Sequence, residues 1–378
     1  MDEYELILLA SLLHDLGKFW QRTGQRHSAS YAMFDERDYG PHGAHAKWSA
    51  DFIERFLPAA WRPAARGALF HHRPHDYVTK LVAVADWLSS GERDDVDIDA
   101  GVQASQLLTL FARLRPDAAV PAPAPHYYGL EPLALTEQAL FPRPDLLAAA
   151  ERQAAYTRLW DGFVAELSQV PTDAFAAYFA TLYYLLQKYT WAVPSAFYRS
   201  VPDVSLFDHA RTTCAIAAAL YRSRIAEAEL DALLAREPAA WETPRLLLLG
   251  GDITGVQAFL YTITARGAAR GLRGRSFYLQ LVGEAIARWL LRRLGLPLPN
   301  LLYVGGGRFY LLAPLLPEAE IAQLRADLDR RLLRCHQGEL YVALGAQPLA
   351  ARDLRLEPRA AGRDFGALWA AVGQELDR

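Results

Sequence analysis

Histidine and aspartate residues in the N-terminal part of this chain have the types and order that a hydrolytic metal site needs. In chain order the candidates are His14, Asp15, His45, His71, His72 and Asp86. Such a site uses neutral imidazoles and carboxylates that converge from several rigid segments, and it keeps one coordination position open for water. The series therefore predicts a divalent-metal centre that activates water for hydrolysis.

These side chains must be positioned by helices, because the apolar residues around them recur at helical spacing. The predicted helices cover residues 4–16, 43–57, 64–72 and 77–90. His45 shares a face with Phe52 and Phe56, and Asp86 shares one with Val82. A carboxylate buried on such a face is costly without a partner, so we expect the faces to converge. A single histidine on an apolar face is more often an ordinary core residue, but the joint pattern favours the metal centre.

The composition sets outer limits on the function. The 378 residues suffice for two or three domains at roughly 100–200 residues each, and 52% hydrophobic residues exclude a disordered chain. A net charge of -3 leaves only a local basic patch for nucleic acid. Cys214 and Cys335 form no CxxC pair, which disfavours a cysteine zinc site and suits a reducing compartment. No apolar run reaches ~18 residues, so we expect a cytoplasmic protein without a membrane span.

The second half of the chain has a different sequence pattern, in which strands alternate with helices. RLLLLGGD, which starts at Arg245, predicts a buried strand, and residues 276–294 predict a helix. NLLYVGGGRFYLLAP predicts a hairpin that turns on three consecutive glycines. A charged helix over 318–334 and a last strand, ELYVALGAQPL, follow. The order β-α-β-β-α-β is typical of a ferredoxin-like domain.

Several of these motifs resemble a known family. LLHDLGKF, HAKWSADFI, FHH and VAVADWLSSGER are similar to the permuted HD nuclease domain in the large subunit of type III-A CRISPR effector complexes. VPSAFYRSVPDVSLFDHARTTCAIAAALY resembles the middle of that subunit. GGDITGVQAFLY, LRGRSFYLQLV and YVGGGRFYLLAP resemble its first palm domain. The similarity covers nearly the whole chain, with the motifs in the order of the family.

We therefore expect an α+β protein built of successive parts. An all-helical, HD-type, metal-dependent nuclease domain covers 1–95, and a loop-rich and then helical linker covers 96–240. A ferredoxin-like (βαββαβ) palm, cyclase-like but lacking the GGDD motif, covers 241–361. Residues 362–378 begin a further helix.

The resemblance also implies a set of site residues. The implied metal ligands are His14, Asp15, His45, His72 and Asp86, with His71 as a further choice and His14 and Asp15 as the catalytic pair. One or two divalent transition-metal ions, with Mn, Ni or Co expected, would generate a hydroxide that cuts single-stranded DNA by in-line attack on phosphorus. Lys18 would neutralise the scissile phosphate, and the alternative is a cation at a helix C-terminus.

The middle region contains an acidic-His-Thr segment with two interpretations. His209, Thr212 and Thr213 lie on one predicted helix, where they could serve chemistry or structure. We favour the structural interpretation, in which these residues attach the linker helix to the palm.

The palm departs from the family pattern. In the family, two palms face each other and make cyclic oligoadenylate from ATP, with the catalytic carboxylates in a GGDD hairpin on the second palm. Here the hairpin reads Gly305-Gly306-Gly307-Arg308, and no GGDD occurs in the chain. Asp252 could supply one ligand, but nucleotidyl transfer needs more carboxylates. We expect no synthesis from this chain alone. The three glycines and Asp252 would contact ATP, with Mg, only in an assembly with a second palm-containing half, and whether that half is a separate polypeptide stays open.

A local basic patch precedes and enters the long predicted palm helix. Its members are Arg266, Arg270, Arg273 and Arg275. Arginine is suited to bidentate contacts with phosphate, so ATP phosphates, guide RNA or a neighbouring subunit are the expected partners. The alternative is a solvated helix face.

Three functions follow from these observations. The leading hypothesis is a metal-dependent endo- or exonuclease for single-stranded DNA within an RNA-guided antiviral complex, with guide RNA and the other complex subunits as partners. The second is an HD nucleotide phosphohydrolase with a regulatory palm, and the third is an assembly scaffold with a silent metal site. The palm motifs favour the first over the second, and the complete donor series favours it over the third.

Overall fold

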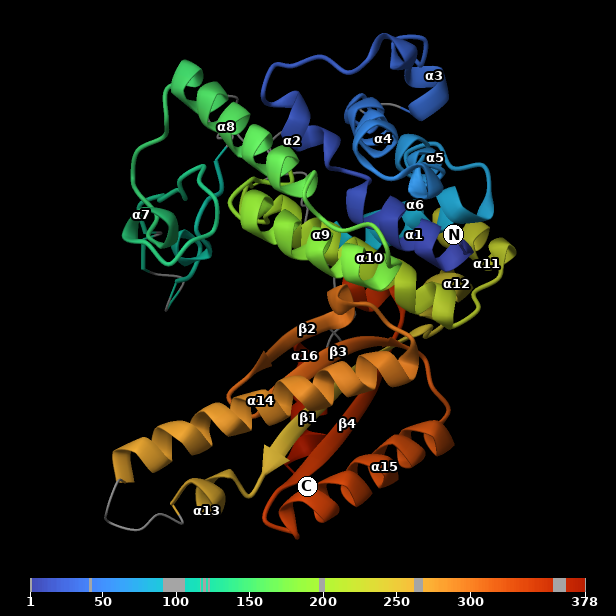
Figure 1. Ribbon diagram of the computed structural model, residues 1–378. Coiled ribbons are helices and arrows are strands. Elements are labelled where there is room, and N and C mark those ends of the chain that lie inside the picture. The colour runs from blue at the N-terminus through green and yellow to red at the C-terminus, as the bar shows by residue number, and fades with distance from the viewer. Residues whose placement is uncertain are drawn as a thin grey trace. The chain divides into compact units, whose positions relative to one another are not determined.

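The computed structural model describes residues 2–40, 43–90, 106–115, 117, 120–121, 123–196, 201–261, 268–355 and 365–377. The chain divides into two compact units, Met1–Ala217 and Ala218–Arg378. The first is helical, and the second contains the β-sheet (Figure 1). This agrees with the expected α+β class. No helix among the described residues has the length and apolar character that a membrane crossing needs.

The first unit is built from helices of very different length. Its longer helices are α1 (Glu3–Leu13), α4 (His45–Phe56), α6 (Tyr77–Ser89), α8 (Ala149–Leu167), α9 (Phe175–Thr190) and the start of α10 (Leu206–Arg222). The shorter elements are α2 (Gly17–Gln21), η1 (Ala29–Tyr31), α3 (Glu36–Tyr39), η2 (Ala59–Trp61), α5 (Ala64–Leu69), η3 (Leu110–Ala112) and α7 (Glu137–Leu140). The predicted helices over 4–16, 43–57, 64–72 and 77–90 correspond to α1, α4, α5 and α6.

Side-chain caps define where the helices of the first unit begin. Asp2 accepts a hydrogen bond of 2.8 Å from the backbone N–H of Glu5 and caps α1. Asp76 and Thr79 form a reciprocal capping box at the start of α6. These caps orient α1 and α6, the two helices whose C-terminal ends carry polar residues of the predicted site.

An aromatic core joins α8 to the N-terminal helices. Phe163 of α8 stacks on Phe52 of α4 with ring centroids 5.7 Å apart, and Trp160 stacks on Trp20 of α2 at 5.0 Å. Such aromatic pairs contribute beyond the burial of their surface. The helix that the sequence assigns to a linker therefore packs directly on the predicted metal-binding helices.

The second unit contains a four-stranded antiparallel sheet in the order β2-β3-β1-β4. The strands are β1 (Leu246–Thr254), β2 (Leu301–Gly305), β3 (Arg308–Pro314) and β4 (Tyr341–Leu349). The helices and short turns are α11 (Glu227–Leu234), α12 (Pro238–Glu242), α13 (Val256–Tyr261), α14 (Ala268–Leu294), η4 (Leu298–Asn300), α15 (Glu318–His336), η5 (Ala351–Leu354) and α16 (Phe365–Leu376). The strand order and the long helices α14 and α15 give the expected ferredoxin-like arrangement.

The two faces of β1 carry different layers. Helices α14 and α15 cover one face of the sheet, and α16 lies behind the other (Figure 1). Successive residues of a strand point to opposite faces, and β1 uses glycine where a helix or ring comes very close. A Cβ on Gly250 would lie 2.5 Å from Val372 of α16, and a Cβ on Gly251 would lie 2.0 Å from the ring of Phe309.

Candidate metal centre

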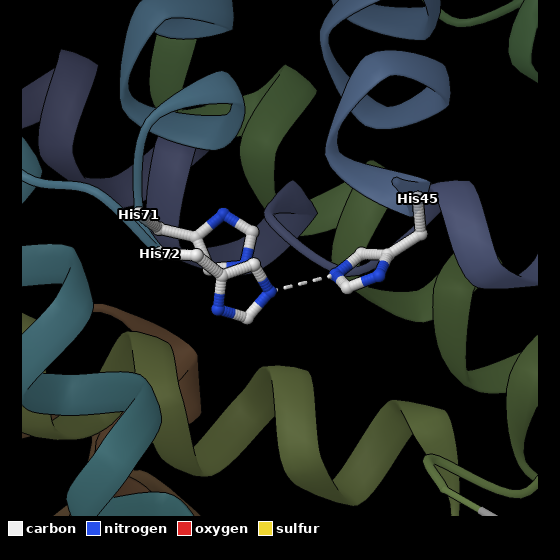
Figure 2. Close-up of side chains that lie close together, drawn as sticks. All are labelled: His45, His71 and His72. Atoms are coloured by element: carbon white, nitrogen blue, oxygen red, sulfur yellow. Dashed lines mark hydrogen bonds between the residues drawn. The ribbon is translucent and has the colours of Figure 1, made fainter. Parts of the chain in front are cut away.

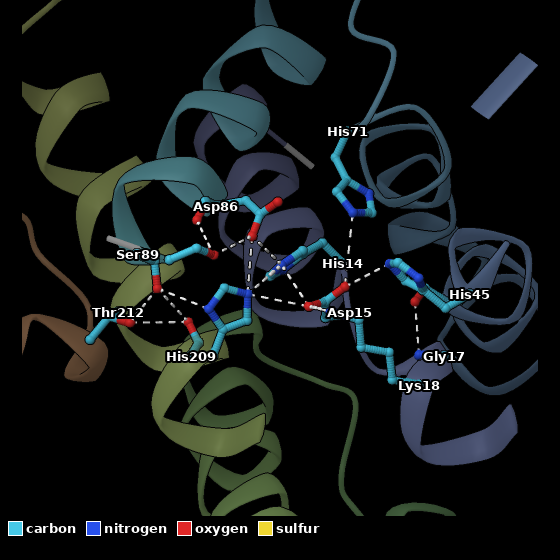
Figure 3. A network of polar contacts seen from close by, with 12 residues as sticks. His14, Asp15, Gly17, Lys18, His45, His71, Asp86, Ser89, His209 and Thr212 are labelled. Atoms are coloured by element: carbon cyan, nitrogen blue, oxygen red, sulfur yellow. Dashed lines mark hydrogen bonds and ion pairs between the residues drawn. The ribbon is translucent and has the colours of Figure 1, made fainter. Parts of the chain in front are cut away.

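The polar residues of the predicted series converge at one place in the first unit (Figure 3). His14 and Asp15 lie in the turn between α1 and α2, and His45 is the first residue of α4. His71 and His72 lie in the turn after α5, because that helix ends at Leu69 and not at residue 72 as predicted. Asp86 lies in the last turns of α6. Helix ends thus direct these donors toward a common point.

One group of donor atoms contains His14, Asp15, Asp86 and His209. His14 Nε2 lies 3.5 Å from Asp15 Oδ2 and 3.5 Å from Asp86 Oδ1. His209 Nε2 lies 3.2 Å from the same Asp15 oxygen, 3.0 Å from the same Asp86 oxygen and 3.2 Å from His14 Nε2. Donor atoms bound to one ion at about 2.1 Å are separated by roughly 3.0–3.4 Å in octahedral or tetrahedral geometry. The three distances from His209 Nε2 lie within this range, and the two from His14 Nε2 to the carboxylates lie just above it.

A second group contains His45, His71 and His72 (Figure 2). The Nε2 atoms of His45 and His72 lie 3.2 Å apart. The other carboxylate oxygen of Asp15, Oδ1, lies 2.8 Å from His45 Nε2 and 3.9 Å from His71 Nε2. The carboxylate of Asp15 therefore lies between the two groups and presents one oxygen to each.

Backbone carbonyls orient two of the histidine rings. His14 Nδ1 donates to the carbonyl oxygen of Ser11 at 2.8 Å, and His71 Nδ1 donates to that of Ala68 at 2.7 Å. A carbonyl oxygen can only accept a hydrogen bond, so the proton is on Nδ1 when the ring is neutral. The lone pair of Nε2 then points toward the donor groups, as in histidine ligands of metal sites.

Burial keeps the second group uncharged. It lowers the pKa of His45 to about 4, and the pKa of His71 and of His72 to about 3. Burial would raise the pKa of Asp15, but the charges of Lys18 and His14 hold it well below its usual range. The same opposition holds the pKa of the Asp86 carboxyl well below its usual range, because the adjacent imidazoles of His14 and His209 favour its charged form. Neutral imidazoles and ionised carboxylates are the forms that bind metal.

The first group attracts positive charge. Burial alone would lower the pKa of His14, yet the carboxylates of Asp15 and Asp86 outweigh this effect, and the pKa of His14 is raised.

Two buried atoms of the centre lack a hydrogen bond of acceptable geometry: Asp15 Oδ1 and His71 Nε2. Leaving such atoms unsatisfied costs about 1–3 kcal/mol each. A divalent cation would satisfy both, so the residues present fit a metal ion.

The centre is mostly buried, and some of its residues are partly exposed. Asp15 is 2% exposed and His71 is fully buried, whereas Asp86 is 15% and Lys18 is 18% exposed. Lys18 forms an ion pair with Asp15 Oδ2. Its ammonium group therefore lies in a partly exposed position beside the carboxylate shared by both donor groups.

His209 is the residue whose role the sequence interpretation missed. The predicted role was to attach the linker helix to the palm; the contacts that the structure shows for this segment are with α6, where Ser89 Oγ lies 3.1 Å from His209 Nδ1 and 2.6 Å from Thr212 Oγ1. His209 and Thr213 are fully buried in the first unit. The available signal was a histidine on the apolar face of an alanine-rich helix, the same signal that marked His45.

The palm candidates do not form a comparable site. Asp252 is paired with Arg308 at 3.0 Å, and among the described residues it belongs to no group of metal donors. Gly306 and Gly307 have φ values of 61° and 86°, which a tight hairpin turn requires. The contact of ATP with the three hairpin glycines and Asp252 stays a prediction.

The predicted basic patch is spread along α14. Arg270 and Arg273 are exposed. Arg275 donates to the carbonyl oxygen of Phe259 and lies 5.0 Å from the centre of its ring. Arg266 lies outside the described residues. The contact of these side chains with nucleic acid or phosphate likewise stays a prediction.

Family models match a part of each unit. Residues 2–91 match the HD domain family, and residues 245–378 match the family described as Csm1 subunit domain B. A single-strand-specific deoxyribonuclease Cas10/Csm1 (subtype III-A) of Methanocaldococcus jannaschii is 28% identical over 94% of this chain and 46% of its own length. The protein of the same name from Mycobacterium tuberculosis is 31% identical over 93% of this chain and 46% of its own length.

A solved structure agrees with the sequence relatives. The crystal structure of a Csm1-Csm4 cassette in complex with cA4 matches with a TM-score of 0.72 and 25% identity, covering 100% of this chain and 48% of that chain. The chain thus spans about half the length of the curated relatives it matches.

Proposed function

We propose that the chain belongs with the Cas10/Csm1 large subunits of type III-A CRISPR systems, and that its first unit is a metal-dependent nuclease for single-stranded DNA. The relatives are named for this activity, and the donor groups supply chemistry that suits it. The observation that carries the proposal is the carboxylate of Asp15, which presents one oxygen to each of two buried donor groups.

Each donor group would hold one divalent ion. The ligands of the first would include His14, Asp15 and Asp86, and those of the second would be His45, His71 and His72 with Asp15 shared. Bound ions supply Lewis acidity and a water of lowered pKa for attack on phosphorus. The imidazole-rich donors suit Mn, Ni or Co better than Mg, which prefers an all-oxygen environment.

The protein residues would position the substrate as well as the ions. Lys18 is partly exposed beside Asp15, so its ammonium group would offset the charge of a phosphodiester bound there. The buried rings behind it are fixed by carbonyl acceptors and would not need to move during a reaction.

The test is cleavage of single-stranded DNA with added Mn²⁺ by the native chain and by His14→Ala/Asp15→Ala. A matched control is His75→Ala/Asp76→Ser, which alters another adjacent His-Asp pair of the same unit while serine preserves the cap of α6. We expect cleavage by the native and control proteins and none by the site variant. Equal cleavage by all three would refute the site, and an inactive native chain would refute the nuclease. Hydrolysis of free nucleotides in place of DNA would favour the phosphohydrolase alternative.

For the palm, we propose a role that needs a second palm-containing half. The hairpin at 305–308 carries no carboxylate, and Asp252 is neutralised by Arg308. The chain incubated alone with ATP and Mg²⁺ should therefore form no oligoadenylate, and any adenylate product would contradict this. The glycines at 305–307 would face ATP in the assembled pair.

The partners follow from the relatives. The Csm1 of the solved cassette is bound to Csm4, and we propose a Csm4-like subunit, guide RNA and a cytoplasmic setting for this chain. Co-purification with a Csm4-like subunit tests the first of these. Failure of the two proteins to associate at micromolar concentration would contradict it.

A further inference from the structure

We propose that Glu375 and Arg325 close the free edge of strand β4 against pairing with β4 of a second copy of this chain. The proposal concerns the second unit and does not depend on the metal centre. In the order β2-β3-β1-β4, the strands β2 and β4 are the two edges of the sheet that the structure describes. An edge strand presents unpaired N–H and C=O groups to which a further strand can add. A sheet that does not extend must therefore have both edges covered or interrupted.

The sequence of β4 makes its edge the one that needs protection. β4 reads YVALGAQPL and carries no charged side chain over its nine residues. Uncharged segments of high β-propensity are those that pair most readily with another chain. β2 differs, since it is only five residues long and its register with β3 shifts between Leu301 and Tyr303. An irregularity of this kind itself blunts an edge.

The register of β4 shows which of its backbone groups point away from the sheet. The carbonyl oxygen of Leu349 accepts from the N–H of Arg245 at 3.1 Å, so Leu349 faces the side of β1. Alternate residues of an antiparallel strand direct their N–H and C=O groups to opposite sides. The outward-facing residues are therefore Val342, Leu344, Ala346 and Pro348. Because proline has no N–H, the middle of the free edge is formed by the groups of Leu344 and Ala346.

Two charged side chains bond to these outward groups. Arg325 of α15 donates to the carbonyl oxygen of Leu344 at 3.0 Å. Glu375 of α16 accepts from the N–H of Ala346 at 2.8 Å and from the side chain of Gln347. Hydrogen bonds in which one partner is ionised are stronger than neutral ones. Since α15 and α16 lie on opposite faces of the sheet (Figure 1), the charged groups reach the edge from both sides.

A glycine of β4 lets α16 come close enough for this contact. A Cβ on Gly345 would lie 3.0 Å from the carbonyl oxygen of Val372 and 3.1 Å from the Cβ of Glu375. Both distances are short for atoms in van der Waals contact, so a side chain at position 345 would hold α16 farther from the strand. The glycine therefore allows the carboxylate of Glu375 to lie at the edge of β4.

The competing explanation is that Glu375 serves only to fasten α16 to the sheet. α16 also contacts the sheet through Trp369, whose ring lies 4.0 Å from that of Tyr310 between centroids. A fastening role predicts that removal of Glu375 lowers the free energy of unfolding and leaves the mass of the chain in solution unchanged. An edge-closing role predicts self-association that rises with protein concentration.

The experiment measures the mass of the full chain by light scattering during size-exclusion chromatography, at concentrations up to about 100 µM, where exposed strand edges associate. We expect the native chain to keep one mass and Arg325→Met/Glu375→Ala to form dimers or larger species as its concentration rises. Methionine retains the packing of the arginine stem without its charge. The matched control, Glu320→Ala/Arg330→Met, makes the same changes at exposed positions of α15 and should behave as the native chain does.

Two further measurements locate the association at the β4 edge. Ala346→Pro, added to the double variant, removes an outward N–H without removing a bond to β1, and it should restore the native mass. In dilute Glu375→Ala, the backbone N–H of Ala346 should exchange with solvent at least about tenfold faster than in the native chain, because it has lost its acceptor.

The possible results decide between the two roles. A folded double variant that keeps the native mass at every concentration would overturn the proposal, as would association that persists with Ala346→Pro or unchanged exchange at Ala346. If the double variant does not fold by circular dichroism, Arg325→Met alone decides, because it leaves the contact of α16 intact, and an unchanged mass there overturns the proposal. A native chain that associates and is made monomeric by Ala346→Pro would show that the edge is open and would overturn it as well.

Discussion

Gly17 packs directly against the backbone of His45: a Cβ at position 17 would lie 2.0 Å from the carbonyl oxygen of His45. The backbone N–H of Gly17 also donates to Ser49 Oγ at 2.8 Å. This contact sets the distance between the turn that carries Asp15 and the helix that carries His45. The glycine therefore determines how close the two donor groups come to one another.

Gly17→Ala should lower both the free energy of unfolding and the affinity for metal, because the added methyl group must push α2 away from α4. Overpacking of this kind costs about 1–3 kcal/mol, measurable by urea denaturation, and Mn²⁺ affinity should fall with it. Gly129→Ala is the control, since a Cβ there meets only an ordinary contact at 3.6 Å. Native-like affinity in Gly17→Ala would show that the site does not depend on this approach.

Lys18→Met should lower DNA cleavage by about tenfold or more, which corresponds to about 1.4 kcal/mol in the barrier. The variant loses the cation that would offset the phosphate charge. Its Mn²⁺ affinity should stay equal or rise, because the ammonium group no longer competes for Asp15. Lys47→Met, on α4 beside the ring of Tyr39, is the control. Unchanged cleavage would instead support a helix-terminal cation.

Glu166 should contribute to the acid sensitivity of the first unit. Hydrogen bonds from Lys188 at 2.6 Å and Tyr189 at 2.8 Å lower its pKa below the ordinary 4.5. A carboxylate with a lowered folded-state pKa stabilises the fold above its unfolded pKa and loses that effect as pH falls through the folded value. Glu166→Gln should therefore flatten the fall in unfolding free energy below about pH 4.5. Parallel pH curves for variant and native protein would contradict this.

The two cysteines should differ in reactivity. Burial raises the pKa of Cys214 to about 12, whereas Cys335 is exposed. Ellman's reagent at pH 8 should titrate one thiol in the native chain and both after denaturation. The fast thiol should disappear in Cys335→Ser. Rapid labelling of Cys214 in the folded protein would show that α10 does not stay packed on α1.

Much of the metal centre could be predicted from the sequence, because helical periodicity shows which side chains face inward. That logic identified His45 on α4 and Asp86 on α6, and the structure brings them together with His14 and Asp15. Strand and turn patterns likewise indicated the β-α-β-β-α-β order of the second unit. These are local signals, carried by residues within one or two helical turns or one hairpin.

Tertiary packing alone decided the rest, because periodicity shows that a face is buried but not which face it meets. The sequence by itself determined the type of donors and the helices that carry them. Only the fold placed His209 beside Asp86, divided the donors into two groups around Asp15, and paired Asp252 with Arg308. Each of these depends on segments far apart in the chain, whose approach is set by the packing of whole helices and strands.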